Sequence, residues 1–95
     1  MSADVIATFV ADTPEQLKKM RVAAQNGDAS GLKKVAHYLK GSAMYIGADR
    51  MTELCKQVQT EASRDLLRAA EAVAALEAEA GRVCAALECP LKDGR

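Results

Sequence analysis

Apolar side chains recur at steps of three and four residues along most of this 95-residue chain. The last such segment, between Asp65 and Leu87, carries them at Leu66, Ala69, Val73, Leu76, Ala80, Val83 and Leu87. Steps of this size place side chains on one face of an α-helix, whereas a half-buried strand needs strict alternation. Aromatic residues, which favour strands, make up only 3% of the chain. We therefore expect an all-α protein.

Start and stop signals divide the first part of the pattern into two helices. The apolar patch between Val5 and Val10 predicts a short first helix that ends at the Thr13–Pro14 step, because a residue before proline avoids helical geometry. Thr13 is a hydroxyl cap, Pro14 suits the first helical position, and Gln16 stands three residues after the cap. These signals predict a second helix that runs to about Asn26.

The rest of the chain predicts three more helices. Asp28 is expected to cap a helix that ends at Gly47, and the next helix starts near Asp49 and ends around residues 62–64. The last helix covers about 65–87, before Pro90 and Gly94. Short connections make successive helices antiparallel neighbours. We expect an up-and-down antiparallel four-helix bundle with a short extra N-terminal helix, in a single domain over residues 1–95, with the ordered bundle at about 4–88 and a tail at 89–95.

Composition narrows the classes of protein that the chain can belong to. Hydrophobic residues make up 49%, but 19 of them are alanine, so the core is expected to be thin and built of small side chains. A formal net charge of zero argues against a general polyanion binder. No apolar run approaches the roughly 20 residues that span a bilayer, and no basic leader precedes the first apolar stretch. We expect a soluble cytoplasmic monomer without a membrane segment.

The three cysteines give no sign of a metal or redox site. Cys55, Cys84 and Cys89 cannot all pair within one chain, and none stands in a CxxC spacing. Reduced thiols are the simplest interpretation, with Cys55 as a small hydrophobic residue of a helix core. The chain also lacks a GxxxxGK[ST] phosphate-binding loop, so it carries no signature of direct ATP use.

The only histidine, His37, lies on an unexpected side of the third predicted helix. At about 100° per residue, the apolar positions Val35, Leu39 and Ile46 fall about 160° to 180° away from it. The residues that share its side, within about 60°, are Ser30, Lys33, Lys34, Lys40, Gly41 and Met44. His37 is therefore expected to be exposed rather than part of the core. A solvated surface histidine without a function remains the alternative at this point.

This face can support phosphoryl transfer. An imidazole that is neutral near pH 7 is a nucleophile and could accept a phosphoryl group. Lys40 stands where an ammonium could pair with phosphoryl oxygens, and Gly41 removes a side chain that would obstruct an approaching partner. The segment 18–50 holds seven basic and two acidic residues, against four basic and seven acidic in 53–88, which suggests an acidic partner. The plainer interpretation is that these lysines are solvated surface residues without a function.

The string Ala36-His37-Tyr38-Leu39-Lys40-Gly41-Ser42-Ala43, followed by Ile46-Gly47-Ala48 and Leu54-Cys55, resembles a known family. It is similar to the histidine-containing phosphotransfer (HPt) domains of multistep two-component phosphorelays, from about Phe9 to the end of the last helix. The resemblance implies that His37 is the phosphoacceptor and that Lys40 and Gly41 support it. Gln59 falls where related domains often carry a glutamine that hydrogen-bonds the histidine; a solvated Gln59 is the alternative. Met44 and Tyr45 are bulkier than the residues usual at these positions.

The resemblance also implies the reaction and the partners. A response-regulator receiver domain would dock, bring its aspartyl phosphate and its Mg²⁺, and transfer the phosphoryl group to His37, from which a second receiver takes it. A hybrid sensor histidine kinase would stand upstream, and the chain would act as a phosphocarrier with no cofactor of its own. Docking is expected on Lys33, Lys34 and Met44, extended by apolar residues of the Val5–Val10 segment.

Two other functions stay open at the level of sequence. A non-catalytic helical adaptor could bind receiver domains without phosphotransfer, and only a phosphorylation assay would separate it from a phosphocarrier. A nucleic-acid binder could use the basic third helix, but a net charge of zero and the lack of a recognition motif argue against it.

Overall fold

The computed structural model describes residues 2–92, and side chains as far as residue 88. The described residues form four α-helices and no strand: α1 (Ala3–Gln25), α2 (Ala29–Ile46), α3 (Asp49–Ala62) and α4 (Leu66–Lys92). The all-α prediction is therefore confirmed.

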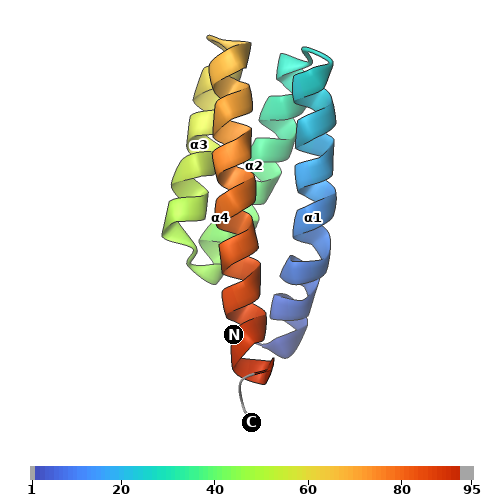
Figure 1. Ribbon diagram of the computed structural model, residues 1–95, viewed down its shortest axis with the longest axis vertical. Helices are drawn as coiled ribbons and strands as arrows, with labels where there is room; N and C mark the ends of the chain where they lie inside the picture. The colour runs from blue at the N-terminus through green and yellow to red at the C-terminus, as the bar shows by residue number, and fades with distance from the viewer. Residues whose placement is uncertain (1, 93–95) are drawn as a thin grey trace.

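The four helices lie side by side in a ring around one core. α1 and α3 each pack against both α2 and α4. In Figure 1 the colour gradient runs in alternate directions along successive helices, and the start of α1 lies at the same end of the bundle as the end of α4. The result is a rod of 46 × 20 × 19 Å.

Glycines and acidic caps fix the ends of α2. The Asp28 carboxylate accepts a hydrogen bond from the Gly31 backbone N–H at 2.9 Å, which satisfies a free donor of the first turn. Gly47 adopts a left-handed φ of 77°, and the Ala48 N–H reaches back to the Ala43 carbonyl at 2.9 Å. This is a Schellman motif, which side chains other than glycine rarely allow. The predicted limits of this helix at Asp28 and Gly47 are confirmed.

The predicted break at Thr13–Pro14 is wrong, because α1 continues through Pro14 as one helix. Buried residues follow one face across the proline at Phe9, Thr13, Leu17 and Met20, so one continuous helix buries all four against the same core. That packing outweighs the one backbone hydrogen bond that proline removes. Thr13 is 1% exposed inside the helix rather than a cap. A separate short N-terminal helix is therefore not present.

The last helix extends beyond its predicted end. α4 includes Pro90 and reaches Lys92, whereas Pro90 was expected to end the ordered part. Proline keeps a helical φ and removes only one donor, so a final turn can include it. Gly94, the second predicted stop, lies outside the described residues.

Alanine is the most frequent residue of the core, in line with the composition. The buried hydrophobic residues are Phe9, Leu17, Met20, Ala23, Leu32, Ala36, Leu39, Ala43, Met51, Leu54, Cys55, Val58, Ala62, Ala69, Ala72, Val73, Leu76 and Ala80. Many of them are alanines, so neighbouring helices can approach closely.

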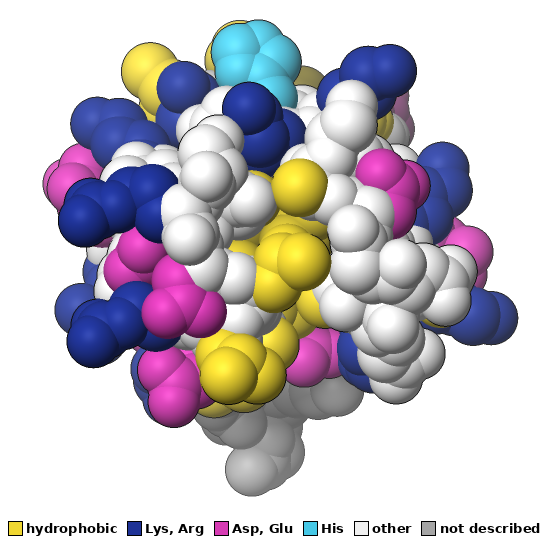
Figure 2. All heavy atoms as spheres, turned by 90° about the horizontal axis from the view of Figure 1, so that it is seen from above, with side chains coloured by type: hydrophobic (Ala, Val, Ile, Leu, Met, Phe, Trp, Pro, Cys, Tyr) yellow, Lys and Arg dark blue, Asp and Glu magenta, His cyan; other side chains and the backbone are white. Residues whose placement is uncertain are grey.

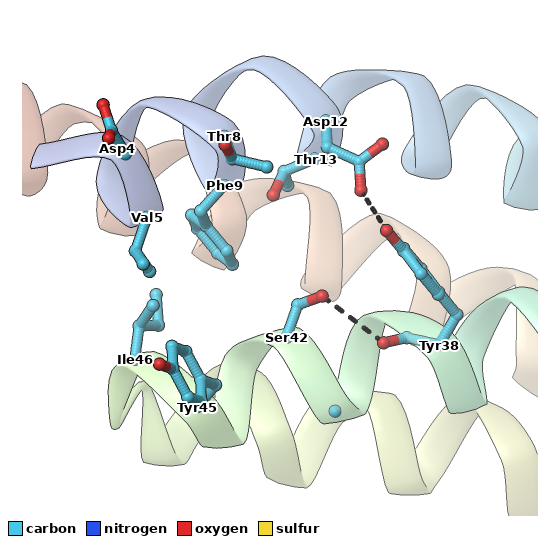
Figure 3. A pocket seen from close by; sticks show the side chains of 11 residues that line it. Asp4, Val5, Thr8, Phe9, Asp12, Thr13, Tyr38, Ser42, Tyr45 and Ile46 are labelled. Carbon is cyan, nitrogen blue, oxygen red and sulfur yellow. Dashed lines mark hydrogen bonds between the residues drawn. The ribbon is translucent and has the colours of Figure 1, made fainter. Parts of the chain in front are cut away.

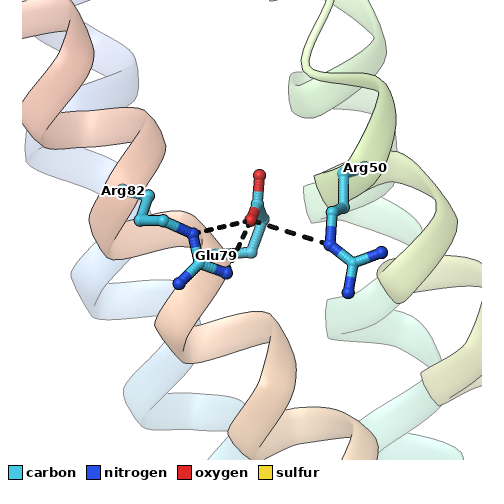
Figure 4. A network of polar contacts seen from close by, with 3 residues as sticks. All are labelled: Arg50, Glu79 and Arg82. Carbon is cyan, nitrogen blue, oxygen red and sulfur yellow. Dashed lines mark hydrogen bonds and ion pairs between the residues drawn. The ribbon is translucent and has the colours of Figure 1, made fainter.

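An ion-pair cluster ties α3 to α4 at the surface. Arg50 Nε of α3 lies 3.9 Å from Glu79 Oε1 of α4, and Arg82 binds the same carboxylate at 2.8 Å (Figure 4). The Glu79 side chain is only 14% exposed. Two guanidinium groups thus neutralise a carboxylate that is largely removed from water.

Candidate functional site

The two faces of α2 differ sharply in burial. The inward face carries Leu32, Ala36, Leu39 and Ala43, none of them more than 1% exposed. His37 is exposed on the other side, as expected from the spacing. Figure 2 shows this histidine at the rim of the molecule with Lys and Arg side chains next to it. Core packing therefore does not restrict the imidazole.

The residues predicted to share the side of His37 are mostly exposed too. Lys33, Lys34 and Gly41 are exposed, and Met44 is 59% exposed. Lys40 is half-buried. The lysines and a flexible apolar side chain thus surround the histidine without covering it.

The turn between α2 and α3 brings Lys40 close to Cys55. Burial raises the pKa of the Cys55 thiol to about 12, and the positive charge of Lys40 opposes that increase. Residues equally far from the turn at Gly47 lie at the same level of the two helices, so His37 lies level with the segment of α3 that contains Gln59. Gln59 is half-buried there. Among the described residues, no side-chain hydrogen bond joins Gln59 to His37.

Gly41 opens onto a groove between α1 and α2. A Cβ placed on Gly41 would meet no atom within 4 Å. The groove, which we call the α1–α2 groove, has a volume of about 540 Å³ and is lined by Asp4, Val5, Thr8, Phe9, Asp12, Thr13, Tyr38, Gly41, Ser42, Tyr45 and Ile46 (Figure 3). It starts at Tyr38, the residue after His37, and runs toward the turn that follows α2.

The Val5–Val10 segment, which is expected to extend the docking surface with apolar side chains, faces two different hollows. Val5 and Phe9 line the α1–α2 groove, with Phe9 itself 5% exposed. Ile6 and Val10 instead line a separate hollow against α4, beside Leu87. Helical spacing explains this division, because residues one position apart point about 100° away from each other.

A cross-helix hydrogen bond closes the groove at its end near His37, and the sequence analysis missed it. The Tyr38 hydroxyl donates to Asp12 Oδ2 of α1 at 2.7 Å (Figure 3). This bond and the negative charge of Asp12 raise the pKa of the Tyr38 phenol. The available signal was a second stripe on α2, in which Tyr38, Gly41 and Tyr45 follow one another at steps of three and four residues.

Other kinds of site find no support in the described part of the chain. No group of three or more His, Cys, Asp or Glu side chains there is placed to hold a metal ion. None of the four helices, within the residues described, combines the length and apolar character that crossing a membrane requires.

Comparison with known proteins identifies the family. No curated protein and no solved structure matches the chain significantly. The family model of the Hpt domain matches residues 4–88, which is nearly the whole length of the chain. A four-helix protein with an exposed histidine on its second helix is thus covered by a single domain model, and the chain belongs to the Hpt domain family.

Proposed function

We propose that the protein is a phosphocarrier that accepts a phosphoryl group on His37 from a receiver-domain aspartate and passes it to another receiver. Membership of the Hpt family implies a phosphotransfer role in two-component signalling. The observation that carries the assignment to this residue is the exposure of His37 on the side of α2 away from the core.

The chemical step needs only the imidazole from this chain. The unprotonated ring nitrogen of His37 attacks the phosphorus atom in line, a P–N bond forms, and the P–O bond to the aspartyl carboxylate breaks. The carboxylate leaves with the electron pair of that bond, and the reverse step passes the phosphoryl group on. The receiver contributes its own Mg²⁺, and this chain binds no nucleotide. Catalysis then depends on positioning and on charge stabilisation.

Lys40 and Gln59 take supporting roles in this proposal. The Lys40 ammonium, one turn after His37, stabilises the negative charge that builds up on the phosphoryl oxygens during transfer. Gln59, on the neighbouring helix at the same level, forms no hydrogen bond to His37 in the described part of the free protein; its proposed role is to bind the imidazole during transfer and to keep the unprotonated nitrogen turned outward. Gly41 leaves the approach open, since a side chain at this position would project into free space.

Docking uses the surface around the histidine. Lys33 and Lys34 attract an acidic receiver surface, while Met44 provides an adaptable apolar contact. Such a contact is transient and buries less than about 1,200 Å² in total. We further propose that the protein is a cytoplasmic monomer that works between a hybrid sensor histidine kinase and receiver domains. In this role the antiparallel bundle is the rigid support of His37.

Incubation with a panel of phosphorylated receiver domains tests the proposal. We expect at least one receiver to raise the intact mass of the protein by one phosphoryl group, and the adduct to be lost in acid, because a P–N bond is acid-labile. Lys40→Ala is expected to slow the transfer and to leave the melting temperature unchanged. Receiver binding without any mass increase would instead favour a non-catalytic adaptor.

A further inference from the structure

A hydrogen bond between Tyr38 and Asp12 spans one end of the α1–α2 groove. Figure 3 shows Tyr38 and Asp12 joined across the groove at one end, with Val5, Tyr45 and Ile46 at the other. Tyr38 directly follows His37 in the chain. The pair therefore lies at the end of the groove that is nearer to His37 along α2.

The Asp12 carboxylate is held from two sides. Its Oδ1 accepts a hydrogen bond from Gln16 Nε2 at 3.2 Å, one turn later on α1, and its Oδ2 accepts from the Tyr38 hydroxyl at 2.7 Å. Within the described part of the chain, the Asp12–Tyr38 bond is the only side-chain hydrogen bond between α1 and α2. The carboxylate is thus fixed in place before any partner arrives.

The pair lies just before the weak point of α1. Pro14 has no N–H, so the helical hydrogen bond to the Val10 carbonyl is missing. The backbone hydrogen bonds of the helix therefore hold residues 3–13 less firmly than the rest of α1. Apolar contact at Phe9 and the bond from Asp12 to Tyr38 attach this segment to the bundle beside the groove.

We propose that Asp12 and Tyr38 form a positioning pair that sets the width of the α1–α2 groove and so selects which receiver can dock with its phosphoaspartate at His37. This inference rests on the proposed function. Neither residue takes part in the chemical step. The pair holds residues 3–13 of α1 at a fixed distance from α2 and keeps the Tyr38 ring over the groove, so that a matching receiver surface finds its site already formed.

Three variants separate the hydrogen bond from the side chains that form it. Asp12→Ala removes the acceptor, and Tyr38→Phe removes the donor but keeps the ring. Asp12→Asn keeps an acceptor oxygen and is the conservative rescue. Glu77→Gln is the matched control, because it weakens a polar contact between α1 and α4, to Arg21, on another side of α1. Tyr38→Phe keeps the test valid if Asp12→Ala fails to fold.

Two phosphate donors distinguish docking from chemistry. Phosphoramidate is a small molecule that can phosphorylate an exposed histidine without docking, since its P–N bond breaks and ammonia leaves. We expect Asp12→Ala and Tyr38→Phe to react with it at the wild-type rate. The second donor is the phosphorylated receiver that labels the wild type fastest. For Asp12→Ala and Tyr38→Phe, the receiver concentration that gives half the maximal labelling rate should rise about threefold to tenfold, while the maximal rate stays unchanged. Asp12→Asn and Glu77→Gln should stay within about twofold of the wild type.

Two further readouts test the inference, and the first of them, the preference among receivers, would not respond to a merely structural role. The preference of the wild type for one receiver over the rest of the panel should narrow in Asp12→Ala and Tyr38→Phe. Amide hydrogen exchange should become faster in residues 3–13 and stay unchanged in residues 66–80. The inference would be overturned if both variants kept the half-saturating receiver concentration and the receiver preference of the wild type. It would also be overturned if they lost labelling by phosphoramidate as much as labelling by the receiver. A wild type that no receiver labels would overturn the proposed function and this inference together.

Discussion

Positive charge is used in two different ways on the two sides of this bundle. On α3 and α4, Arg50 and Arg82 are both paired with the shielded carboxylate of Glu79. Around His37, Lys33 and Lys34 are exposed and form no ion pair within the part of the chain that the structure describes. The arginines satisfy a charge of the protein itself, whereas the lysines leave theirs for an external partner. Unpaired charge of one sign beside a nucleophile points to function rather than to stability.

The two faces of α2 also divide between stability and function. Its inward face is packed to 1% exposure or less, and its outward face carries the histidine and Met44 without support from the core. Substitutions on the inward face should therefore change folding, and substitutions on the outward face should change transfer.

Leu39→Ala should be the most damaging change to stability. Leu39 is 1% exposed, and truncating a buried leucine leaves a cavity that costs about 2–5 kcal/mol. Urea unfolding would measure the loss. A cost below about 0.5 kcal/mol would mean that the inward face of α2 is not part of a packed core.

Gly41→Gln should reduce receiver-driven phosphorylation of His37 by about tenfold or more, which is at least about 1.4 kcal/mol in the transition state. The added side chain would enter the α1–α2 groove without a clash in the free protein, and glutamine favours a helix more than glycine does. Gly81→Gln on α4 is the matched control, because Gly81 is also exposed with no atom within 4 Å of an added Cβ. Equal loss of activity in both variants would contradict an access role for Gly41.

Lys33→Glu combined with Lys34→Glu should lower the rate of association with a receiver by about threefold to tenfold at low salt. The melting temperature should hardly change, because both lysines are exposed and unpaired within the described residues. Stopped-flow measurements over a range of salt concentrations would test this. Reversing two charges elsewhere, Arg64→Glu with Arg68→Glu, should leave the rate near that of the wild type; a similar loss would show only a general charge effect.

Glu79→Gln should have the smallest effect, a loss of at most about 1 kcal/mol in unfolding free energy, with phosphorylation unchanged. The charge of Glu79 is shielded between two arginines, but both arginines are largely exposed to water. Glu53→Gln serves as the comparison, because Glu53 and its partner Lys56 are both exposed. Lower phosphorylation in Glu79→Gln at an intact fold would show that the two uses of charge are not separate.

Local sequence signals predicted the parts of this protein that depend on local physics. The limits of α2 follow from a cap at Asp28 and a left-handed glycine at Gly47, and the direction of His37 follows from helical geometry alone. The break at Pro14 was predicted wrongly, because a burial pattern shared with residues before and after it outweighed a local signal.

The second stripe of α2 shows that Tyr38, Gly41 and Tyr45 share a face, but the sequence does not show that Tyr38 meets Asp12 there. That contact depends on the rotation and depth at which α1 packs against α2, and helical spacing fixes neither. Spacing separates Val5 and Phe9 from Ile6 and Val10, but it does not show that the first pair faces α2 and the second faces α4. Spacing identifies which residues share a face of one helix, but packing decides which face of the neighbouring helix they meet.

The central claim is that His37 carries the phosphoryl group and contributes nothing essential to folding. Its most direct test is the intact mass of the wild type and of His37→Gln after incubation with the same phosphorylated receiver, with circular dichroism as the check on folding. We expect one acid-labile phosphoryl group on the wild type and none on a variant that melts at the same temperature. A variant that still gains the phosphoryl group at the wild-type rate would contradict the assignment, and a variant that unfolds would contradict the exposed position of His37.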